Sequence, residues 1–390
     1  MRIVDVCAFY APRGGGVKTY IDRKLAAGAA HGHEIVILAP GEAHRVERRG
    51  ANARIIYIPS PRFPLDRAYR YFADNAAIHA ALDALRPDFV EASSPWRAAE
   101  AVASWQGAAP RALVMHADPL AAYAYRWFGM VARRETIDRS FGWFWRHLRR
   151  LDARYDLVVS PSHSLAERLR EGGLRQVVTH PLGITTGEFS PALRNLAVRT
   201  ELLARCGLDA KATLLIGVGR HAPEKRWPLV VDACARAGVV HPIGLVLVGD
   251  GRDRARVLRA VGANPHVLTL APITDRPALA QLMASADALI HGCEAETFCL
   301  VAAEARASGL PLIAPDRGGA CDQTREAGGE LYASGDAASA ARAIERLIGR
   351  DVATVGAHAR RQAGATRTMG AHFADLFGAY GEVVRHRRAA

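Results

Sequence analysis

Two cations lie close together in the segment LLIGVGRHAPEKRWPLVVDA, which covers residues 214–233. The apolar run that ends near Val218 predicts a strand, so Arg220 and Lys225 should follow it on a strand-to-helix loop that Pro223 shapes. Two cations on one such loop can hold a diphosphate from two sides. A pair of solvated surface charges is an equally good explanation, because exposed ion pairs need no ligand.

Three consecutive glycines, Gly14, Gly15 and Gly16, follow the first apolar run and precede the helical segment VKTYIDRKLAAGAA. Glycines let a backbone approach a phosphate or sugar closely and point successive N–H groups at it. Their spacing fits neither the G-x-G-x-x-G dinucleotide motif nor the P-loop. A plain flexible turn explains them as well as a binding loop does.

Two glutamates, Glu296 and Glu304, stand eight residues apart in the segment ETFCLVAAEARASGLPLIAP. If a helix starts near Phe298, Glu296 lies at its N-terminal edge and Glu304 about two turns further on, along the same side. The positive end of the helix dipole favours a carboxylate at that edge. Base rates favour a helix cap as the role of a carboxylate so placed.

Short runs rich in Val and Ile alternate with longer amphipathic segments, a pattern typical of parallel sheets covered by helices on both faces. The strands expected in the first half are Ile3–Ala8, Glu34–Leu38, Arg54–Ile58, Asp88–Ala92, Ala112–His116, Leu157–Ser160 and Val177–His180. Those expected in the second half are Thr213–Val218, Gly244–Val248, Val267–Leu270, Ala288–His291 and Leu312–Ala314. The sequence therefore predicts an α/β protein with two sheets in series, whose ligand crevices at the strand ends would face each other.

A length of 390 residues is enough for two domains with separate cores. Gly and Pro punctuate the segment PLGITTGEFSP at residues 181–191, which predicts the boundary there. We expect a Rossmann-like domain over residues 1–185, a second one over 186–365, and a helical segment over 366–390 that crosses back to the first.

The composition, 50% hydrophobic and 23% charged, is that of a soluble globular enzyme. A net charge of +12 attracts anions: nucleic acid, an acidic membrane surface or a phosphorylated small molecule. The excess is spread over both halves of the chain, which argues against nucleic acid. Six cysteines without a C-x-x-C pair predict separate reduced thiols and no metal site. With no visible signal peptide or spanning segment, we expect a cytoplasmic protein.

Taken together, these segments resemble a family-four retaining glycosyltransferase of the GT-B fold, over nearly the whole chain. The resemblance rests on GGGVKTY, PLGITTGEFSP, GVGRHAPEKRWP, LVGDGRDR and, above all, ETFCLVAAEARASGLPLIAP, which matches the family's E-x7-E signature. The family's pattern usually has glycine where this chain has Arg226 and Cys299. The fold implied by the resemblance is two Rossmann-like αβα domains that face each other across an interdomain cleft.

The resemblance also implies roles for single residues. Arg220 and Lys225 would bind the donor diphosphate and stabilise negative charge as the nucleotide leaves, a task that metal ions perform in other transferase folds. Glu296 would lie against the donor sugar near the reacting carbon, and Glu304 would hold the nucleotide ribose. Further donor contacts are implied for Gly15, Gly16, Phe298, Cys299 and Leu300. No metal and no cofactor besides the donor substrate are expected.

His116 ends an expected strand in the segment RALVMHADPL, where this family often keeps a histidine near the donor sugar. A lone histidine is by itself more often a core or loop residue. The resemblance favours His116 as a fourth catalytic residue beside Glu296, Arg220 and Lys225, with His291 as a second histidine candidate.

The segment FGWFWRHLRRLDARYD predicts a basic helix with an aromatic face made of Phe141, Phe144, Trp145, Leu148 and Leu151. Together with arginines at 139, 146, 149, 150 and 154, such a helix can lie in the interface of an anionic membrane. Ordinary core packing of the aromatic face explains the pattern equally well.

We therefore expect an enzyme, a hexosyltransferase that moves a sugar from a nucleoside diphosphate to a hydroxyl of a glycan or lipid-linked acceptor with retention. A non-enzymatic basic protein bound to nucleic acid or acidic membrane is the first alternative, although no nucleic-acid-binding module is recognisable. A GT-B epimerase or phosphorylase is the second, and the E-x7-E block and the missing cofactor-lysine signature disfavour these two. The sugar, the base, the acceptor and the linkage stay open.

Overall fold

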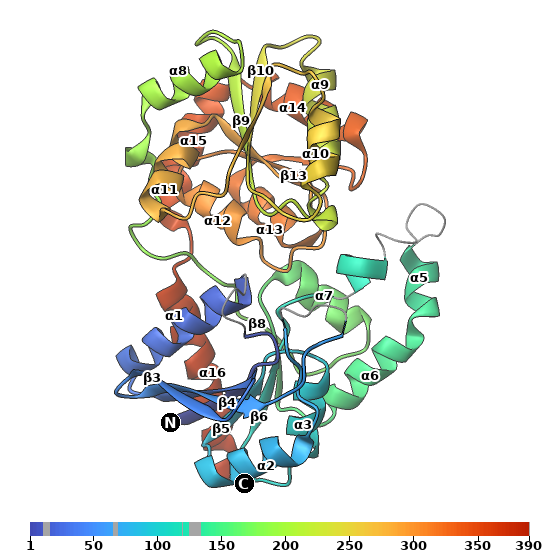
Figure 1. The fold of residues 1–390 in the computed structure, drawn as a ribbon, viewed down its shortest axis with the longest axis vertical. Helices are drawn as coiled ribbons and strands as arrows, with labels where there is room; N and C mark the ends of the chain where they lie inside the picture. The colour runs from blue at the N-terminus through green and yellow to red at the C-terminus, as the bar shows by residue number, and fades with distance from the viewer. Residues whose placement is uncertain (11–15, 65–68, 119, 125–133, 390) are drawn as a thin grey trace. The chain divides into compact units, whose positions relative to one another are not determined.

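The computed structural model describes residues 1–10, 16–64, 69–118, 120–124 and 134–389 (Figure 1). The chain forms two compact units. The first comprises Met1–Asp118, Phe128–Pro181 and Met369–Ala390, and the second comprises Pro119–Trp127 and Leu182–Thr368. The C-terminal segment thus folds with the start of the chain.

The first unit is built on an eight-stranded sheet of order β3-β4-β2-β1-β5-β6-β7-β8. Its strands are β1 (Arg2–Val6), β2 (Glu34–Gly41), β3 (Arg45–Gly50), β4 (Ala53–Pro59), β5 (Phe89–Ala92), β6 (Arg111–Val114), β7 (Leu157–Ser160) and β8 (Val177–Thr179). All pairs are parallel except β3 with β4, which is antiparallel. The sequence missed β3 because this edge strand, RVERRG, is polar and mostly exposed.

Helices cover both faces of this sheet (Figure 1). They are α1 (Gly16–Ala30), α2 (Asn75–Leu85), α3 (Arg97–Ser104), α5 (Arg134–Ser140), α6 (Gly142–Asp152), α7 (His163–Glu171) and α16 (Met369–Ala389). Side-chain caps begin two of them, because Asp74 accepts from Ala76 N–H and Ser162 from Leu165 N–H. α16 lies beside α1, and its Tyr380 ring stacks on Phe89 at a centroid distance of 4.0 Å.

The second unit is built on a six-stranded, wholly parallel sheet of order β11-β10-β9-β12-β13-β14. Its strands are β9 (Thr213–Val218), β10 (Ile243–Val248), β11 (Val267–Leu270), β12 (Ala288–Ile290), β13 (Leu312–Pro315) and β14 (Glu330–Tyr332). Its helices are α8 (Leu196–Arg205), α9 (Trp227–Ala237), α10 (Arg254–Val261), α11 (Arg276–Ser285), α12 (Leu300–Ala307), α13 (Gly318–Ala327), α14 (Ala337–Gly349) and α15 (Val352–Gln362). Short helical turns are η1 (Leu120–Ala124), η2 (Pro191–Leu193), η3 (Pro223–Lys225) and η4 (Ala363–Ala365).

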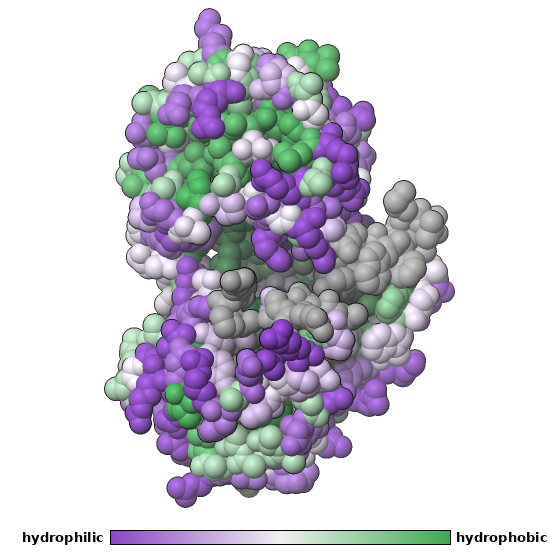
Figure 2. All heavy atoms as spheres, in the orientation of Figure 1, coloured by the Kyte–Doolittle hydropathy of each residue, from purple (hydrophilic) through white to green (hydrophobic). Residues whose placement is uncertain are grey.

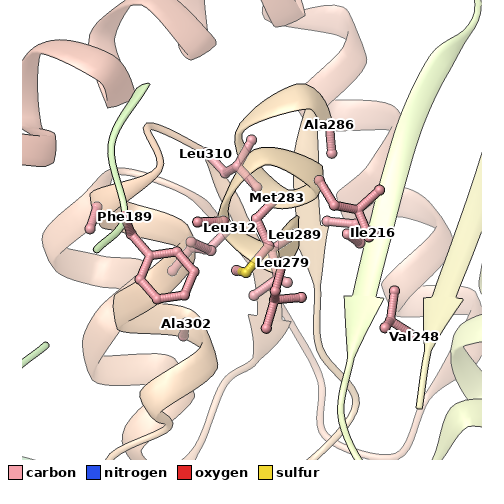
Figure 3. Close-up of a cluster of buried hydrophobic side chains, with 14 of the residues drawn as sticks. Phe189, Ile216, Val248, Leu279, Met283, Ala286, Leu289, Ala302, Leu310 and Leu312 are labelled. Carbon is pink, nitrogen blue, oxygen red and sulfur yellow. The ribbon is translucent and has the colours of Figure 1, made fainter. Parts of the chain in front are cut away.

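One hydrophobic core of the second unit lies between the sheet and the helices α8, α11 and α12. Figure 3 shows Phe189, Ile216, Met283, Leu289 and Leu312 converging there from separate elements. Phe189 comes from the glycine-rich junction segment, so this segment is packed into the second unit. The core fixes both the strand ends and the start of α12, which carry the candidate site.

The surface drawn in Figure 2 has both hydrophilic and hydrophobic residues on each of the two units. Within the ranges that the structure describes, no helix is both long enough and apolar enough to cross a bilayer. All six cysteines are buried and free.

The aromatic face expected for membrane contact packs inward for the most part. Phe144, Leu148 and Leu151 of α6 are buried in the first unit, and Trp145 lies under the Arg168 guanidinium at 5.1 Å. Trp143, which the predicted stripe did not include, is instead 50% exposed. The buried side chains of α6 therefore pack in the interior of the first unit and are not available to a membrane.

Candidate functional site

The neighbouring strands β9 and β12 bring two loops of the second unit together. They pair in parallel register, so their carboxyl ends lie at the same edge of the sheet. The loop after β9 carries Arg220 and Lys225, and the loop after β12 runs from His291 to Cys299. Open α/β sheets bind their ligands at this edge.

Lys225 and Glu296 form the centre of a polar cluster at this edge. Lys225 donates a hydrogen bond from Nζ to Oε1 of Glu296. Nε2 of His291 lies 3.5 Å from the same oxygen and 3.7 Å from Sγ of Cys299. The side chains of Lys225 and Glu296 keep 16% and 22% of their surface exposed, whereas His291 and Cys299 are buried. Three of the predicted site residues, Lys225, Glu296 and Cys299, are thus close together, and the first two are accessible.

The charges of this cluster result from burial acting against ion pairing. Burial favours neutral Glu296, but Lys225 and His291 outweigh it and hold the pKa of that carboxyl well below its usual range. Burial likewise disfavours the ammonium, yet Glu296 raises the pKa of Lys225 above its usual value. Burial lowers the pKa of His291. At neutral pH the cluster therefore holds a cation, an anion and a neutral imidazole.

Arg220 stands apart from this cluster. Its side chain is 75% exposed, and its nearest carboxylate is Glu224 at 3.7 Å. Its backbone carbonyl accepts a hydrogen bond of 3.0 Å from Nε1 of the buried Trp227. The loop is therefore anchored while the guanidinium extends into solvent, free to turn toward an anion.

The two positions where the family's pattern usually has glycine have left-handed backbones. Arg226 has φ 50° and Cys299 has φ 68°, a region that side chains with a Cβ rarely adopt. The guanidinium of Arg226 forms an ion pair of 2.5 Å with Glu294. At both positions a residue with a Cβ therefore adopts a backbone conformation that only glycine takes without strain.

The expected start of the glutamate-bearing helix near Phe298 is wrong by two residues. α12 begins at Leu300, because the left-handed Cys299 cannot belong to a right-handed helix. Phe298 and Cys299 are buried in the core, and Leu300 is partly buried. In the described part of the chain no side chain caps α12, so its first N–H groups are suited to an anion.

Glu304 has partners that the sequence did not suggest. Its Oε1 accepts a hydrogen bond of 2.6 Å from Arg276, and Arg276 also donates to both carboxylate oxygens of Glu188 at 2.8 and 3.1 Å. Hydrogen bonding to Glu188 and Glu304 raises the pKa of Arg276. A ligand hydroxyl that reaches Glu304 must share it with this arginine. Glu188 lies in the junction segment PLGITTGEFSP, so the motif could have pointed to Glu188 as a partner of the site.

His116 lies in the first unit, two residues after β6 ends. Its Nε2 is 3.1 Å from Oγ of Ser93, and its ring meets Tyr20 edge-on at 4.9 Å. Burial, with a smaller effect of the Lys24 charge, lowers the pKa of His116 to about 4, so the ring is neutral at pH 7. Gly16 begins α1, with open space where a Cβ would lie. Gly15 lies outside the described residues.

The sequence also missed a buried charge network in the first unit. Lys24 of α1 lies 3.0 Å from Asp5 of β1 and 2.5 Å from Glu91 of β5, and all three side chains are fully buried. Tyr380 of α16 donates a hydrogen bond of 2.8 Å to Glu91. The signals were Asp5 and Glu91, which are charged residues inside expected strands.

A metal could in principle find ligands at the edge of the second sheet. One ligand atom each of His291, Glu296 and Cys299 lie within 4.8 Å of one another. However, Lys225 already binds the Glu296 carboxylate, and an ammonium at this distance disfavours a cation. A metal ion bound there would have to displace Lys225 from Glu296.

Family models match both halves of the chain. The one described as "Glycosyltransferase Family 4" matches residues 14–188, and the one described as "Glycosyl transferases group 1" matches residues 198–363. Both contain candidate site residues, His116 in the first and Lys225, Glu296 and Glu304 in the second.

Two curated relatives from Mycobacterium tuberculosis align with most of the chain. A GDP-mannose-dependent alpha-mannosyltransferase is 33% identical over 335 residues, which are 83% of this chain and 81% of the relative. A GDP-mannose-dependent alpha-(1-6)-phosphatidylinositol dimannoside mannosyltransferase is 32% identical over 320 residues, 80% and 79% of the two chains.

Solved structures share the fold at low sequence identity. Sucrose-phosphate synthase from Thermosynechococcus elongatus has a TM-score of 0.77 at 19% identity and covers 99% of this chain and 100% of its own. Anabaena HepE in complex with UDP has a TM-score of 0.70 at 18% identity, with 98% and 100% covered.

Proposed function

The chain belongs to glycosyltransferase family 4 and has the GT-B fold, and we propose that it transfers mannose from GDP-mannose to a lipid-linked acceptor with retention. As a family member it is a hexosyltransferase that uses a nucleotide-sugar. The choice of GDP-mannose rests on the two mycobacterial relatives above and on a third from Corynebacterium glutamicum, 27% identical over 84% of this chain. The lipid-linked acceptor rests on the relative that mannosylates a phosphatidylinositol dimannoside.

The Lys225–Glu296 pair is the observation that carries this proposal. A donor diphosphate at the start of α12 would meet the Lys225 ammonium, the exposed Arg220 guanidinium and the uncapped N–H groups of the helix. Binding would draw Lys225 from Glu296 toward the phosphates and leave the carboxylate beside the sugar. The loop would in this way supply the positive charge that diphosphate departure needs.

In the reaction, the bond between the anomeric carbon and the donor diphosphate breaks as the acceptor oxygen bonds to that carbon, and the hydroxyl proton leaves with the nucleotide. Lys225 and Arg220 would stabilise the charge on the departing GDP. Glu304, shared with Arg276, would hold the ribose. The neutral His116 would accept or donate a hydrogen bond at the sugar. Because Lys225 and Arg220 would stabilise the charge without a metal ion, EDTA should leave transfer unchanged.

Nucleotide-dependent thermal stabilisation tests the donor. A ligand that binds the folded state stabilises it by mass action, so GDP and GDP-mannose should raise the melting temperature more than UDP or ADP. Lys225→Ala should remove most of this rise, whereas the exposed Arg256→Ala should not. Mass spectrometry of an incubated lipid extract should then find one added hexose. Preferential stabilisation by UDP or ADP would contradict the GDP assignment.

A peripheral contact with anionic membrane, on the cytoplasmic side, is the second part of the proposal. Trp143, Arg146 and Arg150 of α6 are exposed, and each basic residue near such a surface contributes about 1 kcal/mol. Arg146→Glu with Arg150→Glu should abolish salt-sensitive cosedimentation with phosphatidylglycerol vesicles. Arg256→Glu with Arg259→Glu on α10 is the matched control. Equal recovery of both variants in the pellet would leave α6 as core packing and point to a soluble acceptor.

A further inference from the structure

The second unit contains a cavity at the edge of its sheet opposite to the candidate site. The cavity has a volume of about 340 Å³, within the range of small-molecule pockets. Thr213 begins β9, Asp287 precedes β12 and Leu310 precedes β13, and all three line it. Arg220 and His291 follow the opposite ends of β9 and β12, so roughly 20 Å of strand separates the two sites.

Cations dominate the lining of this cavity. Arg194, Arg199, Lys211 and Arg360 face it together with a single carboxylate, Asp287. A lining with this excess of positive charge favours an anionic occupant.

The Asp287 carboxylate is already bound by neighbouring groups, so it does not neutralise the other cations that line the cavity. Its oxygens accept hydrogen bonds from Arg194 at 2.9 Å, from Arg199 at 2.7 Å and from the backbone N–H of Leu214 at 2.9 Å. These bonds outweigh the effect of burial and lower the pKa of Asp287. Asp287 and Arg199 therefore form a structural clamp that holds α8 to the sheet.

Lys211 and Arg360 are the two cations of the cavity that do not pair with Asp287. Both are exposed, and in the ranges that the structure describes neither forms an ion pair. Burial of part of its surface lowers the pKa of Arg360, and the nearby Arg194 charge acts in the same direction, whereas Asp287 acts against it. Gly309, with φ 76°, admits the Arg360 side chain, because a Cβ there would lie 2.5 Å from its Cγ.

We propose that this cavity binds a small phosphate- or diphosphate-bearing anion, at a site separate from the nucleotide-sugar site. Arg360 and Lys211 would contact the phosphate oxygens, and Arg194 would add charge from the cavity wall. Planar guanidinium groups and an ammonium are the groups that proteins use for phosphate. The side chain of Leu196, 67% exposed on the cavity's rim, offers an apolar edge to the organic part of such a ligand.

Calorimetric titration of the full chain with inorganic pyrophosphate tests the proposal. The wild type should bind pyrophosphate, and it should still do so when Lys225→Ala removes a cation from the donor site. Lys211→Ala with Arg360→Ala should weaken that binding tenfold or more, since each hydrogen bond to a charged group is worth a several-fold factor. Arg256→Ala with Arg259→Ala removes the same charge from α10 and should leave it unchanged. Melting curves of both variants confirm that they fold.

The same titration in a Lys225→Ala background separates this proposal from the proposed function. There the cavity variant should still lose pyrophosphate affinity, whether or not the chain uses GDP. Equal affinity in the cavity variant and the α10 control would overturn the proposal. So would pyrophosphate binding that Lys225→Ala alone abolishes, because the donor site would then be the only site occupied.

Discussion

Each unit contains a lysine that pairs with carboxylates, and the two lysines differ in how many carboxylates they bind and in how exposed they are. Lys24 lies between Asp5 and Glu91 with no surface exposed on any of the three side chains. Lys225 pairs with one carboxylate, Glu296, and both keep part of their surface exposed. A lysine with two carboxylates and no access can only hold the fold together. A lysine with one carboxylate and access can exchange it for a phosphate.

Hydrogen bonds extend the buried network of Lys24, Asp5 and Glu91 beyond its ion pairs. Glu91 accepts hydrogen bonds from Tyr380 and, at 3.4 Å, from Ser93, which in turn contacts His116. Burial raises the pKa of Glu91, although Lys24 acts against it. Burial would lower the pKa of Lys24, but Asp5 and Glu91 raise it above its usual value. The network therefore connects α1, β1, β5 and α16 with the loop of a candidate catalytic residue.

The largest expected effect is on stability, from Lys24→Met. This change leaves two buried carboxylates without a counter-charge, which costs about 3–5 kcal/mol of unfolding free energy. Lys18→Met is the matched control on the same helix, because Lys18 pairs with Asp22 at the surface and should change the free energy by less than about 1 kcal/mol. Urea denaturation measures both. Similar midpoints for the two variants would show that the buried network contributes little.

Lys225→Ala should have the opposite profile. We expect transfer to fall roughly a hundredfold or more, since a charge that stabilises the leaving diphosphate is lost, with a smaller loss of stability than Lys24→Met causes. Arg220→Ala should also lower turnover and leave the melting temperature nearly unchanged, because its side chain is exposed. Steady-state kinetics with labelled donor and urea denaturation separate the two effects. If Lys225→Ala unfolds the chain as readily as Lys24→Met, the contrast between the two lysines fails.

Acid should weaken the fold through His116, which Ser93 connects to the buried network of Lys24. Unfolded histidine protonates near pH 6.5, whereas folded His116 resists protonation down to about pH 4. The unfolded state therefore binds more protons in this window, and the free energy of unfolding falls as the pH drops through it, on the order of 2 kcal/mol after allowance for partial exposure. His116→Gln should flatten the profile measured by urea denaturation at several pH values. An unchanged profile would mean that His116 is not held neutral by its surroundings.

The sequence predicted the features around the two lysines that depend on a single segment of the chain. The strands and the loop with Lys225 follow from apolar runs that end at Gly, Pro or charged residues, and the family resemblance pointed to Glu296 and Glu304. The Lys24 network escaped because its three residues come from three separate elements, α1, β1 and β5, whose pairing only the fold determines. Arg276 escaped for the same reason: its partners Glu188 and Glu304 come from two other segments. Pairing across elements is a property of the folded chain, which spacing along one segment does not reveal.

The smallest expected effect concerns backbone strain beside Lys225. Cys299 has φ 68° and touches His291 through its thiol, so replacing it changes both backbone and packing. Cys299→Ala and Cys299→Gly both remove the thiol, but only glycine adopts this backbone without cost. The glycine variant should therefore be more stable than the alanine variant by about 1 kcal/mol. If thermal unfolding shows alanine equal or better, position 299 is unstrained, and the departure from the family's glycine has no energetic cost. If the glycine variant is more stable than the alanine variant and also has a higher turnover than the wild type, strain at Cys299 limits the activity of the Lys225 site.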